Sequence, residues 1–165
     1  MSEHNLSSKL PNTGTSIFAV MTQLAREHQA VNLSQGFPDF PVSEELIRLV
    51  DKYMEQGQNQ YALMPGVAEL RKAISKMFLE NHGANYDPDQ EINIVAGATQ
   101  GLYTAISAVI SAGDEVIIFE PAYDSYAPAV EVNGGIVRYV EMDLPDFRID
   151  WDRVERTLNE HTRMI

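Results

Sequence analysis

The chain has 165 residues, a formal net charge of -12 and no cysteine, and 44% of its residues are hydrophobic. Because so acidic a chain lacks the basic patch that neutralises nucleic-acid phosphates, nucleic acid is not an expected partner. The lack of cysteine excludes a disulfide framework, a thiolate metal site and a cysteine nucleophile.

Two helices are predicted near the start of the chain. Residues 14–28 carry apolar side chains at helical spacing, with Thr15 or Ser16 as the N-cap. A second helix is predicted to begin after Ser43, to carry acidic residues in its first turn, and to end near Gly57. The apolar residues of these two helices are Ile17, Val20, Met21, Leu24, Leu46, Ile47, Val50 and Tyr53.

A third helix is predicted to have Pro65 in its first turn and to end at residues 81–83. Its predicted buried stripe consists of Val67, Leu70, Ile74, Met77 and Phe78. Two prolines and a glycine make residues 31–41 a loop between the first two helices.

The pattern changes to alternating strands and helices from residue 91 onward. Strands are predicted over residues 92–96, 115–119, 136–141 and from 162, and helices over residues 100–111, 123–132 and 150–159. The strands are short apolar runs, which is typical of a parallel sheet covered on both faces, so an α/β layered fold is expected. Because the chain stops where a strand begins, we expect it to be a fragment.

Residues 95–102 (VAGATQGL) lie between a predicted strand and a predicted helix. Free backbone N–H groups and the positive end of the dipole at a helix N-terminus suit a phosphate group. The alternative is structural, since a Gly-Ala-Thr sequence also serves merely to allow a tight turn and an N-cap.

Residues 119–126 (FEPAYDSY) follow the next predicted strand, at the sheet edge where ligands of such folds bind. Tyr123 is therefore expected to face a ring bound there. The alternative is that Tyr123 and Tyr126 only pack a helix onto the sheet, and that Tyr61 is an ordinary core or turn residue.

Four segments in this order, residues 32–41, 60–74, 96–102 and 114–126, resemble the class I/II, fold-type I aminotransferases that use pyridoxal 5'-phosphate. The resemblance covers the chain apart from its first few residues, and the methionine and aromatic (kynurenine-type) aminotransferases are the nearest group. It implies a transferase-like fold with a mainly parallel sheet flanked by helices. Residues 1–42 would form an N-terminal arm and part of the small domain, and residues 43–165 an incomplete large cofactor-binding domain.

The resemblance also implies roles for individual residues. The cofactor phosphate would be held by a single turn, which consists of Gly97, Ala98, Thr99 and Gln100. Tyr123 would stack on the pyridine ring, Tyr61 would reach the phosphate of the opposite subunit, and the backbone at Gly36 would approach the substrate carboxylate. The implied enzyme is a homodimer that acts on an amino acid and a 2-oxo acid.

Transamination needs a lysine to hold the cofactor aldehyde, an acid opposite the pyridine nitrogen and an arginine for the substrate carboxylate. The four lysines, Lys9, Lys52, Lys72 and Lys76, all precede the phosphate-binding turn. Lys72 and Lys76 belong, with Arg71, to the polar face of a predicted helix. We therefore expect the catalytic lysine beyond Ile165 and no transamination by this chain alone.

No metal site is predicted, because His4, His28, His82 and His161 show no paired ligand spacing and are expected at the surface. The acidic residues at 87–91 lack the spacing of a calcium loop. The N-terminus has no signal-peptide core and no run is long enough to span a membrane, so a cytoplasmic protein without a membrane partner is expected.

Three alternatives to the aminotransferase stay open. The closest is a cysteine-conjugate β-lyase on the same scaffold. A nucleotide-binding module is another, although residues 95–102 lack the glycine spacing of a dinucleotide fingerprint. The third is a non-catalytic interaction protein with a closed core, whereas a fragment predicts exposed apolar sheet residues at Ile92, Ile94, Val116 and Ile118.

Overall fold

The computed structural model describes residues 7–11, 13–36 and 38–165, which form two compact units. The sheet unit contains the described residues up to His28 together with Ala96–Ile165, and the helical unit is Gln29–Val95. In the part of the chain that is described, no helix has both the length and the apolar character needed to cross a membrane.

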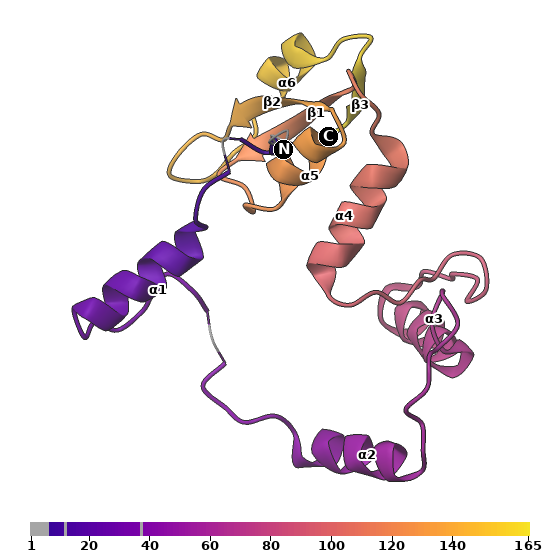
Figure 1. Cartoon of the computed structure of the whole chain (residues 1–165). Helices are drawn as coiled ribbons and strands as arrows, with labels where there is room; N and C mark the ends of the chain where they lie inside the picture. Colours follow the sequence, from indigo (N-terminus) through magenta and orange to yellow (C-terminus); the bar gives the residue numbers. More distant parts are fainter. Residues whose placement is uncertain (1–6, 12, 37) are drawn as a thin grey trace, which may run out of the picture. The chain divides into compact units, whose positions relative to one another are not determined.

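The sheet unit alternates strands and helices after one leading helix (Figure 1). Its elements are α1 (Ile17–Glu27), α4 (Ala98–Val109), β1 (Glu115–Glu120), α5 (Tyr126–Val132), β2 (Ile136–Glu141), α6 (Trp151–Thr157) and β3 (Thr162–Met164). The helical unit contains α2 (Glu44–Glu55) and α3 (Ala68–His82).

The three strands form one parallel sheet in the order β2-β1-β3. β1 pairs with β2 along its whole length, and with β3 at Glu115↔Thr162 and Val116↔Met164. The α/β fold class, the parallel direction and the strand at the end of the chain agree with the sequence-based expectation.

β1 is the centre of the core because side chains alternate between the two faces of a strand. Val116 and Ile118 pack on one face with buried residues of α4 and α5. Ile117 packs on the other face with Val140 and with Val154 of α6. Figure 1 shows α5 and α6 on opposite sides of the sheet, so β1 is buried on both faces.

The expectation that Val116 and Ile118 would be exposed was therefore wrong. Both side chains are buried, because α4 and α5 cover the face of the sheet to which they point. Ile92 and Ile94 are partly buried in the helical unit.

Helix termini follow local sequence signals in part. Ser16 caps α1 by accepting a hydrogen bond from the amide of Ala19 at 3.3 Å. Ser43 occupies the N-cap of α2 without a side-chain cap bond. α3 ends at Gly83, whose left-handed backbone (φ 67°) is the common helix terminator.

Two predicted helix starts differ from the structure, and one predicted strand is absent from it. α3 begins at Ala68 rather than at Pro65, because Gly66 has a φ of +97° that no helix accommodates. α5 begins at Tyr126, three residues later than expected. Residues 92–96 form no strand, since the amide of Ile94 donates to the carbonyl of Pro65 (3.1 Å) instead of to a neighbouring strand.

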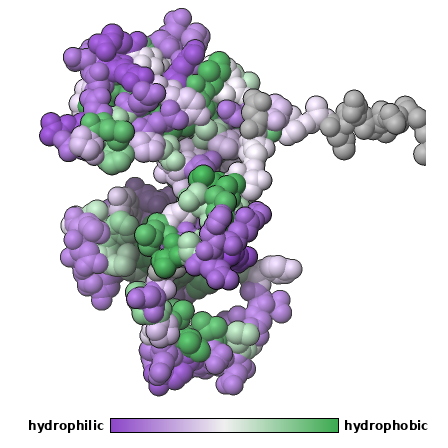
Figure 2. Space-filling view, turned by 90° about the vertical axis from the view of Figure 1, so that its left-hand side faces the viewer, coloured by the Kyte–Doolittle hydropathy of each residue, from purple (hydrophilic) through white to green (hydrophobic). Residues whose placement is uncertain are grey.

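The apolar faces of α1, α2 and α3 are less buried than their periodicity suggests. No described residue of α1 or α2 is buried, and in the predicted stripe of α3 only Ile74 and Phe78 are even partly buried. Figure 2 shows hydrophobic areas at the surface of the face in view, interspersed with hydrophilic ones. Periodicity therefore identified these helices correctly but did not determine what covers them.

Arg71 of α3 is buried, although the sequence placed it on a polar face. Its Nη1 group donates to the carbonyl of Pro88 and lies 3.1 Å from the Asp89 carboxylate. The loop at residues 87–91 thus folds over the guanidinium and removes it from solvent, which a helical pattern alone does not reveal.

One buried carboxylate connects β1 to β2 and to the segment that precedes β3. Glu115, at the start of β1, is 5% exposed and accepts hydrogen bonds from Arg138 of β2 (2.5 Å) and from the Asn159 side chain (2.8 Å). Asn159 precedes β3, and the backbone amide of Glu115 donates to the carbonyl of His161 (2.8 Å). The side-chain hydrogen bond from Arg138 has the largest effect on the pKa of Glu115, followed by the one from Asn159. Together they lower this pKa from 4.5 to about 2.

This lowered pKa predicts a specific dependence of stability on pH. The Glu115 carboxylate stabilises the fold fully above its unfolded-state pKa and loses that effect as the pH falls from 4.5 toward about 2. In urea titrations at a series of pH values, Glu115→Gln should lower the free energy of unfolding at neutral pH and flatten its decline over that window. Glu155→Gln, which alters an exposed carboxylate of α6, is the matched control. An unchanged acid profile in Glu115→Gln would contradict the prediction.

Candidate functional site

The turn that leads into α4 has the features of an anion-binding helix N-terminus. Gly97 is the N-cap, with φ 89° and ψ 166°, and no side chain caps the helix. The bond from the Gly101 amide to the Gly97 carbonyl (3.3 Å) starts the helical series. The geometry of a helix therefore leaves the amides of Ala98, Thr99 and Gln100 without intrahelical acceptors.

The backbone of Gly97 lies in a region of φ and ψ that only glycine occupies readily. A Cβ atom built at this position has no other atom within 4 Å, so the space above the turn is open. The turn thus offers a concentration of N–H groups and the positive end of the α4 dipole to a group that approaches from outside.

Gln100 holds the chain on both sides of this turn together. Its side-chain Oε1 atom accepts a hydrogen bond at 2.6 Å from the amide of Ala96, the residue that precedes the N-cap. With that oxygen engaged, Gln100 can offer a ligand its backbone amide and its side-chain Nε2 group as donors.

Tyr123 reaches the same turn from the carboxyl end of β1. Its hydroxyl lies 3.5 Å from the Thr99 hydroxyl, although the two residues are 24 positions apart. The ring packs edge-on against Tyr126 at 5.8 Å and lies tilted, at 6.5 Å, to Phe18 of α1. The fold therefore brings two of the predicted site residues together and leaves the ring of Tyr123 44% exposed.

An apolar hollow of about 620 Å³ opens between α4, β1, α5 and β3. Tyr123 and Tyr126 belong to its wall. The other lining residues are Leu102, Ala105, Ile106, Val116, Ile117, Ile118, Phe119, Pro121, Ala122, Val130, Met142, Met164 and Ile165. Sequence reasoning missed both this hollow and the Phe18 contact, because their residues converge only in the folded chain and carry no spacing signal.

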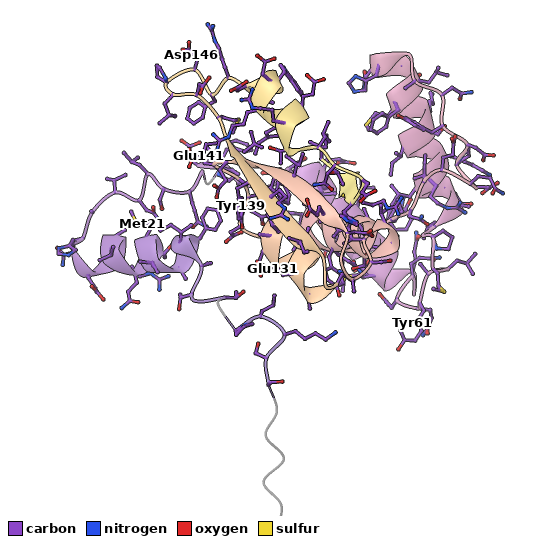
Figure 3. All side chains as sticks on the ribbon, turned by 90° about the horizontal axis from the view of Figure 1, so that it is seen from above. Met21, Tyr61, Glu131, Tyr139, Glu141 and Asp146 are labelled. Atoms are coloured by element: carbon purple, nitrogen blue, oxygen red, sulfur yellow. The ribbon has the colours of Figure 1, made fainter. Side chains whose placement is uncertain are left out.

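Tyr61 and Gly36 belong to the helical unit, so they are described within that unit alone. Tyr61 is fully exposed and projects away from its loop (Figure 3). Gly36 is exposed as well, and a Cβ atom built on it meets nothing within 4 Å. Both positions are thus accessible to molecules outside the unit.

Among the described residues, no group of three His, Asp or Glu side chains is placed to hold a metal ion. His28, His82 and His161 are exposed, and His4 lies outside the described residues. Burial, followed by the charges of Glu120 and Glu131, raises the pKa of Tyr139, a β2 residue labelled in Figure 3.

None of the four lysines is among the residues that line the hollow. Lys52 sits 5.7 Å from the centre of the Tyr53 ring, and Lys76 pairs with Glu80 at 3.6 Å on the surface of α3. Lys9 and Lys72 are exposed.

Comparison with known sequences identifies a family. The family model described as aminotransferase class I and II matches residues 28–165. The methionine aminotransferase of Escherichia coli (strain K12) is 49% identical over 158 residues, which are 96% of this chain and 41% of that protein. A probable N-succinyldiaminopimelate aminotransferase of Mycobacterium tuberculosis is 36% identical, over 96% of this chain and 40% of that protein. The chain thus spans about two fifths of the length of these relatives.

Solved structures agree in fold. YbdL from Escherichia coli, whose structure and reactivity identified a methionine aminotransferase function, matches with a TM-score of 0.92 and 48% identity. The match covers 96% of this chain and 42% of YbdL. The N-succinyldiaminopimelate aminotransferase of Mycobacterium tuberculosis matches with a TM-score of 0.88 and 35% identity, over 97% of this chain and 42% of that chain.

The backbone conformation of Gly97 lets us predict how an added methyl group would change the stability of the fold. Gly97→Ala should reduce the free energy of unfolding by about 1–3 kcal/mol, because its φ and ψ are strained for any residue with a Cβ. Gly14→Ala is the control, since it has open space and no positive φ, and should be close to neutral. Equal stability of Gly97→Ala and Gly14→Ala in urea titrations would show that the turn is not held in this conformation.

Proposed function

The chain belongs to the family of class I and II aminotransferases, and from this premise we propose that it forms the N-terminal part of a pyridoxal 5'-phosphate-dependent aminotransferase. The observation that carries the proposal is the 3.5 Å approach of the Tyr123 and Thr99 hydroxyls. It places an aromatic ring beside a helix N-terminus, which is the arrangement that a phosphorylated heterocycle requires.

The residues of the turn suit the phosphate group. The amides of Ala98, Thr99 and Gln100 would donate hydrogen bonds to its oxygens, and Gly97 would allow those oxygens to approach the backbone closely. The Thr99 hydroxyl adds a donor. Donors to a charged acceptor form shorter and stronger hydrogen bonds than donors to a neutral one, so the turn determines where the phosphate lies.

Tyr123 provides the surface for the ring of the cofactor. Offset stacking of two aromatic rings contributes about 0.5–1.5 kcal/mol beyond the area that it buries. The edge-on contact with Tyr126 and the tilted contact with Phe18 hold the Tyr123 ring in place. When bound, the cofactor supplies an electron-accepting ring for the bonds at the α-carbon of an amino acid.

Tyr61 and Gly36 have proposed roles toward a partner subunit and the substrate. The full exposure of Tyr61 supports a contact with the cofactor phosphate of a second copy, with the phenol hydroxyl as donor. The exposed backbone at Gly36 suits the approach of a substrate carboxylate. In this proposal the whole enzyme is a homodimer.

The proposed substrates are an amino acid, with methionine or an aromatic residue favoured, and a 2-oxo acid. Support for methionine comes from the identity of 49% to the methionine aminotransferase of Escherichia coli. A kynurenine–oxoglutarate transaminase of Dictyostelium discoideum, 35% identical over 82% of this chain, supports an aromatic donor.

The proposal assigns the catalytic lysine to a segment beyond Ile165, so this chain binds the cofactor but does not transaminate. Residues 1–42 would be the arm and part of the small domain, and residues 43–165 the first part of the large domain, of a cytoplasmic enzyme. The compact units of the structure divide at other positions, between His28 and Gln29 and between Val95 and Ala96.

Cofactor binding gives the first test. Pyridoxine 5'-phosphate has no aldehyde, so it cannot react with the lysines of the chain, and calorimetry should show that it binds at least about tenfold more tightly than pyridoxine. Thr99→Val should weaken only the phosphorylated ligand, about fivefold for one lost hydrogen bond. Tyr123→Leu should weaken both ligands by a similar factor, because the stacked ring is common to them.

Two residues of α4 offer matched controls. Thr104→Val and Tyr103→Leu make the same chemical changes at exposed positions of the helix, and should leave both affinities unchanged. Equal binding of pyridoxine and its phosphate, or tighter binding of ADP than of pyridoxine 5'-phosphate, would overturn the proposed cofactor.

The gene provides a second test. Sequencing of the coding strand past the codon for Ile165 should reveal an in-frame segment with a lysine that follows the phosphate-binding turn in chain order. The longer protein that includes this segment should transfer the amino group of methionine or an aromatic amino acid to a 2-oxo acid. A longer protein that binds the cofactor but shows no transfer with any amino acid would contradict the proposed reaction.

A further inference from the structure

α4 and α5 pack on the same face of the sheet and are joined by polar contacts near both of their ends. Near the start of the helices, the hydroxyl of Thr99 lies 3.5 Å from that of Tyr123, which precedes α5. Near their end, the side-chain amide of Asn133 donates a hydrogen bond to the hydroxyl of Ser107 at 3.0 Å. The two contacts therefore lie at opposite ends of the helix pair, and only the first belongs to the proposed cofactor site.

Asn133 is placed for this hydrogen bond by the way in which α5 ends. It is the C-cap of α5, and its side-chain amide donates a second hydrogen bond, at 2.8 Å, to the carbonyl of Ala129. Both protons of the amide group are therefore used, one within α5 and one across to α4. The side chain of Asn133 is partly buried, which limits the competition of water for these bonds.

The turn that follows Asn133 packs closely against the end of α4. A Cβ atom built on Gly135 would lie 2.7 Å from a side-chain atom of Ile110, the C-cap of α4. The amide of Gly113 donates to the carbonyl of Gly134 at 3.0 Å. The far end of α4 is thus held by α5 and by the turn after it.

Apolar packing alone defines the position of α4 along α5 less sharply than these bonds do. Ile106 and Ile110 share a core cluster with Ala129 and Val130, but hydrophobic burial has no preferred direction, whereas a hydrogen bond has one. An α-helix rises 1.5 Å per residue as one hydrogen-bonded rod. A displacement of α4 at Ser107 is therefore carried to its first turn, about 12 Å along the axis.

We propose that Asn133 is a positioning residue for the cofactor, because its hydrogen bond to Ser107 sets the spacing between the amides at the start of α4 and the ring of Tyr123. The inference rests on the proposed function and extends it to a residue that touches neither the phosphate nor the cofactor ring. A ligand that binds both features gains from the second one only where its length matches their spacing. A ligand that binds one feature alone does not depend on that spacing.

Three ligands separate the spacing from the two features themselves. Pyridoxine 5'-phosphate uses both the ring surface and the turn, pyridoxine uses the ring surface alone, and inorganic phosphate uses the turn alone. Ser107→Ala removes the acceptor of the Asn133 hydrogen bond and places a good helix former in α4. It should weaken pyridoxine 5'-phosphate about fivefold and change the other two affinities less than about twofold. Calorimetry measures the first two ligands, and titration of the amide resonances of residues 98–100 measures inorganic phosphate.

Two further variants and a control complete the experiment. Asn133→Ala removes the same hydrogen bond from the other side and should give the same pattern as Ser107→Ala. The double variant should bind pyridoxine 5'-phosphate no more weakly than the weaker single variant, because both changes break one bond. Ser111→Ala makes the same chemical change at an exposed position just beyond α4, and should leave all three affinities unchanged. If Asn133→Ala does not fold, Ser107→Ala and its control decide the result alone.

Equal weakening of all three ligands in Ser107→Ala would overturn the positioning role, since it would indicate a general loss of structure. Unchanged binding of pyridoxine 5'-phosphate in Ser107→Ala, or additive effects in the double variant, would overturn it as well. Each of these results leaves the proposed function standing. Equal binding of pyridoxine and its phosphate by the unaltered chain would instead overturn the proposed function, and this inference with it.

Discussion

The hydrogen bonds of the buried Glu115 carboxylate hold the sheet unit together. Glu115 starts the central strand, and its two side-chain partners belong to β2 and to the connection between α6 and β3. A carboxylate removed from water is destabilising unless such charged or polar partners compensate it. Arg138 and Asn159 satisfy this requirement, so one carboxylate connects β1 to β2 and to the segment just before β3.

The proposed cofactor site lies at the opposite end of the same sheet. Because β1 is fixed by its neighbours and buried on both faces, the residues that follow it leave the carboxyl edge in a defined direction. Tyr123 consequently meets the first turn of α4, where Thr99 lies. The rigid strand and helix provide the positions, and the loops provide the functional groups, as is common in α/β proteins.

The helical unit contributes in a different way. Its helices expose their apolar faces, and its specific contacts are concentrated at Arg71, which holds the loop at residues 87–91, and at Gly66, which abuts Ile94. The first contact involves Pro88 and Asp89, and the second involves Ile94, so both lie within this unit. Residues 92–96, which their sequence pattern predicts as a strand, have no partner strand among the described residues. Instead, the amide of Ile94 donates to the carbonyl of Pro65.

Local sequence alone determined the existence and type of most elements. Apolar spacing identified the helices, and short apolar runs identified β1, β2 and β3 and their parallel direction, because side-chain periodicity is set by local backbone geometry. Glycine, alanine and threonine at residues 97–99 predicted a turn into a helix N-terminus for the same reason, since the free amides of a helix N-terminus are a local property.

Only the tertiary structure decided how these parts meet. The burial of Arg71 and Glu115, the apolar hollow and the contacts of Tyr123 with Thr99 and Phe18 all join residues far apart in the chain. The prediction of a strand at residues 92–96 was wrong for the same reason. A strand exists only through hydrogen bonds to a neighbouring strand, and its own sequence does not specify that neighbour. Local periodicity determines which face of an element is apolar, but long-range packing decides what that face contacts.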